Sequence, residues 1–102
     1  MRSVNSESDL QLGSGVCAIK FSAEWCGPCK KMEPTVEKLE SEFKSATFLT
    51  VDVDDVPTIA QKYKVRTLPT FVILKNGQEV HRITGMSLID PLRKIFRDIV
   101  VE

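Results

Sequence analysis

Two cysteines separated by two residues, Cys26 and Cys29, are the feature of this sequence best suited to chemistry. Thiols at this spacing can form and break one short disulfide without large movement of the backbone. An apolar run, residues 16–21, comes directly before them, and a helical pattern begins at Cys26. A helix N-terminus carries partial positive charge and free N–H groups, so it favours a thiolate over a thiol. Because the thiolate is the attacking species in disulfide exchange, the pattern predicts a redox-active pair.

The competing interpretations of the cysteines are a structural zinc site and an incidental buried pair. A structural zinc ion needs about four ligands, and besides the pair only Cys17 and His81 remain, on separate expected strands. Cys17 lies inside an apolar run and is expected to be a small core residue. His81 lies between Val80 and Arg82 on an outer strand, where a solvent-facing side chain is expected. We therefore expect no metal site.

The composition excludes several classes of function. The chain has 102 residues, and we expect one domain over residues 1–102 with one hydrophobic core. Lys plus Arg and Asp plus Glu each total 14, so the net charge is zero, which argues against nucleic-acid or membrane-surface binding. With only three cysteines, the chain is expected to work in a reducing compartment rather than as a disulfide-rich secreted scaffold.

The beginning of the chain and its apolar runs bear on localisation. Residues 1–9 are polar and do not resemble a signal peptide. The longest apolar runs are too short to span a bilayer. We expect a cytoplasmic protein, or an organellar one if a presequence is missing from this sequence.

The hydrophobic pattern predicts alternating strands and helices. Strands are expected over residues 1–4, 16–21, 47–53, 70–74 and 79–84, and Asn76-Gly77 joins the last two as a hairpin. Helices are expected over residues 5–12 and 26–44, from a cap at Asp54 or Asp55, and over 90–101, with a kink at Pro34. Crossover helices imply parallel pairing, and the hairpin adds an antiparallel part. The predicted fold class is α/β, with a mixed central sheet and helices on both faces.

These motifs resemble those of the thioredoxin family over nearly the whole chain. The resemblance lies in FSAEWCGPCK at residues 21–30, Pro34, VDVD at 51–54, YKVRTLPTF at 63–71, KNG at 75–77 and Gly85. A bare CxxC is weak evidence, but here it follows an expected strand and precedes a Leu-Pro-Thr by about forty residues. The resemblance implies a thioredoxin-like three-layer sandwich.

The resemblance also implies roles for individual residues. Cys26 would be the exposed nucleophile and Cys29 the recessed resolving thiol, with Trp25 as an active-site lid. Pro69 would be a cis-proline facing the disulfide, which would leave the Leu68 backbone free to pair with an extended substrate, as in strand addition. The implied docking surface is apolar and almost uncharged, and it consists of Trp25, Gly27, Pro28, Leu68, Pro69, Thr84, Gly85 and Met86.

The chain departs from the family pattern beneath the second cysteine. The family usually has a buried aspartate six residues before the nucleophile, where this chain has Lys20, and often a lysine on the neighbouring strand, where this chain has Thr50. Because an unpaired buried ammonium is costly, we expect Lys20 to stay charged by pairing with Asp52 or Glu24. A charged Lys20 would favour the ionised thiols. The alternative is a strand residue that snorkels to solvent.

The activity that the resemblance implies is reduction of protein disulfides by the dithiol, with no bound cofactor. The implied electron donor is a thioredoxin reductase that uses NADPH and a flavin. The implied clients include peroxiredoxins, ribonucleotide reductase and methionine sulfoxide reductase, and a monomer is expected. One alternative is an oxidase or isomerase of the secretory pathway, which Gly27-Pro28 disfavours because oxidising relatives often have histidine there. Another is a non-catalytic thioredoxin-like subunit that binds partners through Leu68-Pro69.

Overall fold

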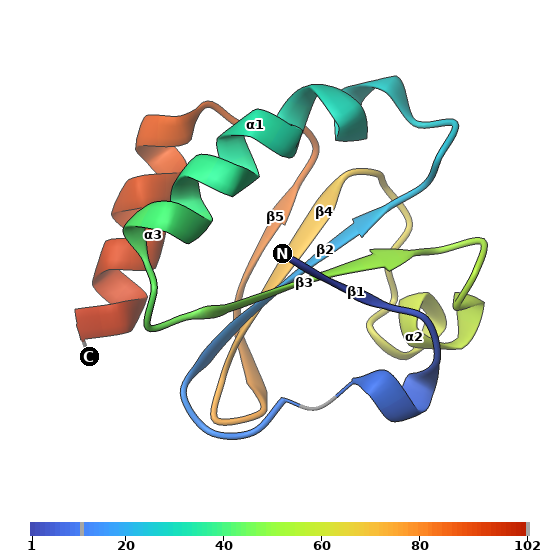
Figure 1. Ribbon diagram of the computed structural model, residues 1–102, viewed down its shortest axis with the longest axis horizontal. Helices are drawn as coiled ribbons and strands as arrows, with labels where there is room; N and C mark the ends of the chain where they lie inside the picture. Colours follow the sequence, from blue (N-terminus) through green and yellow to red (C-terminus); the bar gives the residue numbers. More distant parts are fainter. Residues whose placement is uncertain (11, 102) are drawn as a thin grey trace.

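A five-stranded sheet with three α-helices forms the chain in this computed structural model, which describes residues 1–10 and 12–101. The elements are β1 (Arg2–Val4), a short 3₁₀ turn η1 (Glu7–Asp9), β2 (Val16–Ser22), α1 (Gly27–Glu42), β3 (Thr47–Asp52), α2 (Pro57–Lys62), β4 (Thr70–Lys75), β5 (Gln78–Thr84) and α3 (Ile89–Val101). Helices α1 and α3 cover one face of the sheet and α2 covers the other (Figure 1). The predicted fold class is confirmed.

Strand β2 lies at the centre of the sheet, whose strand order is β1-β3-β2-β4-β5. It pairs in parallel with β3 and antiparallel with β4. Strand β1 adds to β3 in parallel, and β5 adds to β4 in the antiparallel sense. All residues of β2 from Val16 to Phe21 are buried, because helices cover both faces of the sheet at this strand. The mixed sheet with a central apolar strand is therefore confirmed.

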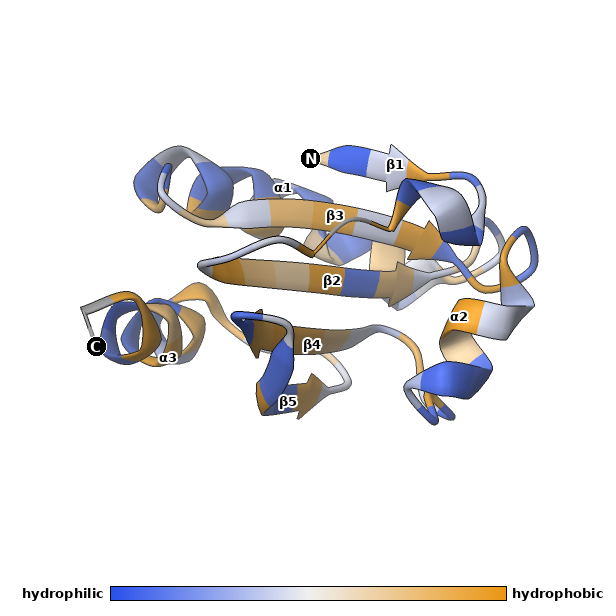
Figure 2. Cartoon of the chain, turned by 90° about the horizontal axis from the view of Figure 1, so that it is seen from below, coloured by the Kyte–Doolittle hydropathy of each residue, from blue (hydrophilic) through white to orange (hydrophobic). Residues whose placement is uncertain are grey.

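The side chains of β2 alternate between two hydrophobic cores. Cys17, Ile19 and Phe21 belong to the core beneath α2 and η1, whereas Val16 and Ala18 belong to the core beneath α1 and α3. The apolar colouring of β2, β3 and β4 in Figure 2 follows this two-sided burial. Because successive side chains point to opposite faces of a strand, the same alternation places position 20 on the α1 side.

Several element boundaries differ from those predicted. Helix α1 begins at Gly27, with Cys26 as its N-cap, and ends at Glu42. The first expected helix is reduced to η1, whose N-cap residue Ser6 makes no side-chain capping hydrogen bond, and Gln11 lies outside the described residues. The N-cap of α2 is Val56, so the expected caps at residues 54 and 55 are wrong. Pro34 lies inside α1, and the kink expected there stays a prediction.

Helix α3 packs into the core through Leu92 and Phe96, both of which are fully buried. The Phe96 contacts are aromatic. Its ring stacks on Phe48 of β3, with ring centroids 5.3 Å apart and planes 14° apart. A second ring, Phe43 after α1, lies 5.7 Å away. This aromatic cluster joins β3 and both helices on that face, so α1 and α3 are fixed relative to each other.

We expect Phe96→Ala to lower the free energy of unfolding by about 3–5 kcal/mol, because it removes a buried ring and leaves a cavity. Urea denaturation followed by circular dichroism would measure this change. The matched control is Arg97→Ala, the next residue on the same helix, which is exposed and should change stability by no more than about 0.5 kcal/mol. Equal effects of the two substitutions would contradict the assignment of Phe96 to the core.

Candidate active site

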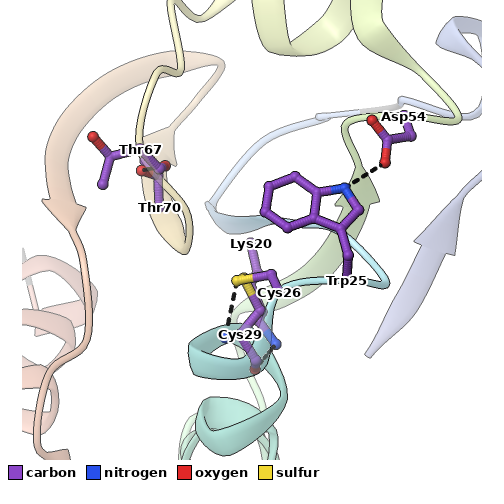
Figure 3. Close-up of a disulfide and its surroundings, with 7 residues drawn as sticks. All are labelled: Lys20, Trp25, Cys26, Cys29, Asp54, Thr67 and Thr70. Atoms are coloured by element: carbon purple, nitrogen blue, oxygen red, sulfur yellow. Dashed lines mark hydrogen bonds between the residues drawn. A yellow bond between two sulfur atoms is a disulfide. The ribbon is translucent and has the colours of Figure 1, made fainter.

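Cys26 and Cys29 form a disulfide at the N-terminus of α1 (Figure 3). Their Cα atoms lie 5.3 Å apart. Cys26 is the N-cap of the helix, and the backbone N–H of Cys29 donates to Cys26 Sγ across 3.2 Å. An N–H donor and the positive end of the helix dipole both favour negative charge on that sulfur once the disulfide is reduced.

The two cysteines line different pockets. Cys26 lines an open groove, whereas Cys29 lines a separate cavity and not the groove. Both residues are buried, with 4% of Cys26 and 1% of Cys29 exposed. The description of Cys26 as exposed is therefore wrong for the disulfide form, because Ala23, Val53 and Leu68 pack around the pair. The order of exposure agrees with the prediction, although the difference is small.

The groove beside Cys26 has a volume of about 500 Å³ and is largely apolar. Trp25 forms part of its wall with 72% of its surface exposed, so it is not a core residue, and its role as an active-site lid stays a prediction. Its indole N–H donates to Asp54 Oδ2 across 2.8 Å, which fixes the ring (Figure 3). The lining residues are Trp25, Cys26, Gly27, Pro28, Val53, Ala60, Val65, Arg66 and Leu68.

Four of these groove residues were not among the predicted docking residues: Val53, Ala60, Val65 and Arg66. Three of the four lie within the family motifs VDVD and YKVRTLPTF. Their place in those motifs is the sequence feature that could have identified them as groove residues. Ala60 comes from α2, and its place in the groove depends on how that helix packs on the sheet.

The segment that faces the pair carries a cis peptide bond between Leu68 and Pro69, as the resemblance implies. Leu68 packs against the two cysteines. The backbone N–H of Gly85 donates to the Pro69 carbonyl across 2.8 Å, and Thr84 pairs with Thr70. Gly85 has φ +80°, a conformation that favours glycine.

The predicted docking residues thus fall into two neighbouring groups. Trp25, Gly27, Pro28 and Leu68 line the groove. Thr84, Gly85 and Met86 do not line it. Thr84 ends β5, Gly85 is hydrogen-bonded to Pro69, and Met86 is 54% exposed.

Lys20 lies beneath the pair and is only 2% exposed (Figure 3). Its Nζ donates to the backbone carbonyl of Cys29 across 2.9 Å. Among the described residues no carboxylate lies within ion-pair distance of Nζ, so the expected pairs with Asp52 or Glu24 are wrong. The first turn of α1 supplies a closer acceptor, and the side chain is too buried to snorkel. Burial lowers the pKa of Lys20, and the charge of Glu33 opposes that effect.

A polar cavity of about 380 Å³, separate from the groove, is lined in part by Cys29. Asp52 lines this cavity. Its Oδ1 accepts a hydrogen bond from the backbone N–H of Asp54 across 2.8 Å, so the carboxylate that was expected to pair with Lys20 binds the backbone instead. The acidic lining residues are Glu24, Glu33, Asp52 and Asp55, and Lys30 is the lysine among the lining residues.

The remaining candidate residues lie away from the pair. Cys17 is 1% exposed, and burial raises the pKa of its thiol. His81 is exposed on β5, as predicted. In residues 1–10 and 12–101 no group of three or more His, Cys, Asp or Glu side chains is arranged to hold a metal ion. Within the same residues no helix has the length and apolar character needed to cross a membrane.

The thioredoxin family profile matches residues 2–98. A thioredoxin H-type protein of Fagopyrum esculentum is 49% identical over 77 residues, which cover 76% of this chain and 66% of that protein. A thioredoxin of Chlamydia trachomatis is 43% identical over 84 residues, which cover 82% of each chain.

Solved structures of thioredoxins are also similar to this chain. The Fasciola hepatica thioredoxin superposes with a TM-score of 0.88 at 36% identity, covering 97% of this chain and 99% of that one. A chain from a study of the thiol resolving mechanism in yeast mitochondrial 1-Cys peroxiredoxin has a TM-score of 0.87 at 33% identity, covering 96% and 94%. Sequence, fold and cysteine geometry agree: the chain belongs to the thioredoxin family, with the Cys26–Cys29 pair as the redox centre of a dithiol disulfide reductase that binds no cofactor.

Proposed function

We propose that Cys26 is the nucleophile and Cys29 the resolving thiol in the reduction of protein disulfides. The observation that carries this assignment is the different environment of the two sulfurs. Cys26 lines the groove, where a client can approach, and it receives the N–H of Cys29. Cys29 is less exposed than Cys26 and lines the polar cavity but not the groove.

The reaction then follows in two exchanges. The Cys26 thiolate attacks one sulfur of the client disulfide, a Cys26–client bond forms, and the other client sulfur leaves as a thiolate that water protonates. The Cys29 thiolate attacks Cys26 Sγ, the Cys26–Cys29 bond forms, and the second client sulfur leaves. The dithiol loses two electrons and the client disulfide gains them.

Client binding is proposed to use the groove and the backbone of Leu68. Within the described chain neither the N–H nor the carbonyl of Leu68 has a hydrogen-bond partner, so an extended client segment can pair with it. The apolar groove beside it gives shape-tolerant recognition of many sequences. Thr84, Gly85 and Met86 extend this surface past Pro69.

The proposed partners follow from the family. The electron donor is a thioredoxin reductase that uses NADPH and a flavin, and the clients include peroxiredoxins and ribonucleotide reductase. The match to a chain from a study of a peroxiredoxin with the glutathione and thioredoxin systems supports the first client class. We propose a single domain over residues 1–102 that acts as a monomer in the cytoplasm. An organellar location follows if a presequence is missing here.

We expect Cys26→Ser to abolish reduction of insulin disulfides with dithiothreitol as electron source, because it removes the attacking sulfur. Cys29→Ser should instead accumulate covalent mixed disulfides with the substrate, visible by non-reducing electrophoresis. Cys17→Ala is the matched control and should retain turnover, since Cys17 is buried away from the pair. Preferential alkylation of Cys29 in the reduced wild-type protein would contradict the assigned roles. Wild-type protein that shows no turnover would favour the non-catalytic alternative.

We expect Asp54→Ala to lower kcat/KM for insulin about threefold to tenfold, because it removes the acceptor that holds the Trp25 ring at the groove. Reduction of a small aromatic disulfide should change less, since such a substrate covers little of the groove. Asp55→Ala, which removes the neighbouring exposed carboxylate, is the control. If both variants behave alike, the Trp25–Asp54 hydrogen bond does not position the client.

A further inference from the structure

The ammonium group of Lys20 is buried against the first turn of α1, the turn that carries Cys29. Lys20 Nζ contacts the carbonyl oxygen of Cys29 itself, at 2.9 Å, and both residues are almost fully buried. Because this contact is to the backbone of Cys29 and both residues are buried, the charge acts on the Cys29 side chain through protein rather than through bulk water. Burial weakens screening, so such a charge has more effect than one on the surface.

Within residues 1–10 and 12–101, Lys20 makes no ion pair. Its neighbours in the sheet are Thr50 on β3 and Phe71 on β4, and neither carries a charge. From α1 the charge of Glu33 acts on it without reaching ion-pair distance. Glu24 and Asp52 line the polar cavity next to Cys29.

We propose that Lys20 is a positioning residue that lowers the pKa of the Cys29 thiol and so speeds the second exchange of the reaction. This inference rests on the proposed role of Cys29 as the resolving thiol. A positive charge stabilises the thiolate but not the thiol, and an opposite charge within a few ångströms shifts a pKa by about one unit or more. The hydrogen bond to the Cys29 carbonyl keeps the ammonium in place while the sulfur changes its bonding.

The change in the pKa of Cys29 determines how much the rate of the second exchange changes. At neutral pH, raising the pKa of Cys29 by one unit lowers its thiolate fraction about tenfold. The remaining thiolate is a stronger nucleophile by about threefold, because nucleophilicity rises with pKa. Loss of the Lys20 charge should therefore slow attack on the mixed disulfide about threefold. Water takes the proton that Cys29 releases, and Lys20 itself exchanges no proton in this scheme.

The test separates the charge of Lys20 from its hydrogen bond. In a Cys17→Ala, Cys26→Ser background the only thiol is Cys29, and the pH dependence of its alkylation by iodoacetamide gives its pKa. Two substitutions are compared in that background. Lys20→Met removes both the charge and the donor, and Lys20→Gln removes the charge but keeps a donor for the carbonyl. Both should raise the pKa of Cys29 by about one unit.

The control is Lys31→Met, which removes an exposed lysine from the same helix and should leave the alkylation profile unchanged. Thermal unfolding confirms that each variant is folded. An unchanged Cys29 pKa in both Lys20 variants, or a rise in Lys20→Met alone, overturns the proposal, because the charge would then have no effect. If Cys29→Ser in the otherwise wild-type chain traps no mixed disulfide, the resolving role of Cys29 fails instead, which is a separate result.

Discussion

Burial of β2 on both faces is the constraint on which the cysteine site depends. The strand is covered by α2 on one side and by α1 and α3 on the other, so its end is held firmly. The chain leaves β2 at Ser22 and enters α1 at Gly27, and this short connection carries Trp25 and Cys26. The pair therefore lies where a rigid strand meets the positive end of a helix, and little of its geometry is left to loop motion.

Local patterns were enough to predict most of this arrangement. The apolar run of β2, the Asn76-Gly77 turn and the periodic stripe of α1 each determine their element through short-range chemistry. The positions of the two cysteines and the cis bond before Pro69 also followed from motif and resemblance. The predictions that failed include local ones, the caps of α2 and the length of the first helix, and others that depend on how distant segments pack.

Lys20 shows why those predictions failed. The expected partner of Lys20 was a carboxylate, because carboxylates can be identified from the sequence. Its actual partner is a backbone carbonyl, and every residue has one, so the sequence does not indicate which carbonyl is used. The groove wall formed by Ala60 is a similar case, since it depends on how α2 packs against the sheet. The near-complete burial of Cys26 likewise results from Val53, which follows β3, and from Leu68, both of which pack against the pair.

The two sulfurs of the pair border different hollows, since Cys26 lines the apolar groove and Cys29 lines the polar cavity. A client segment bound in the groove, as proposed, would lie next to Cys26 without filling the space next to Cys29. Because Cys29 is only 1% exposed, the cavity brings polar side chains rather than open solvent close to that residue. Substitutions in the groove and substitutions in the cavity can therefore alter the surroundings of one cysteine without altering those of the other.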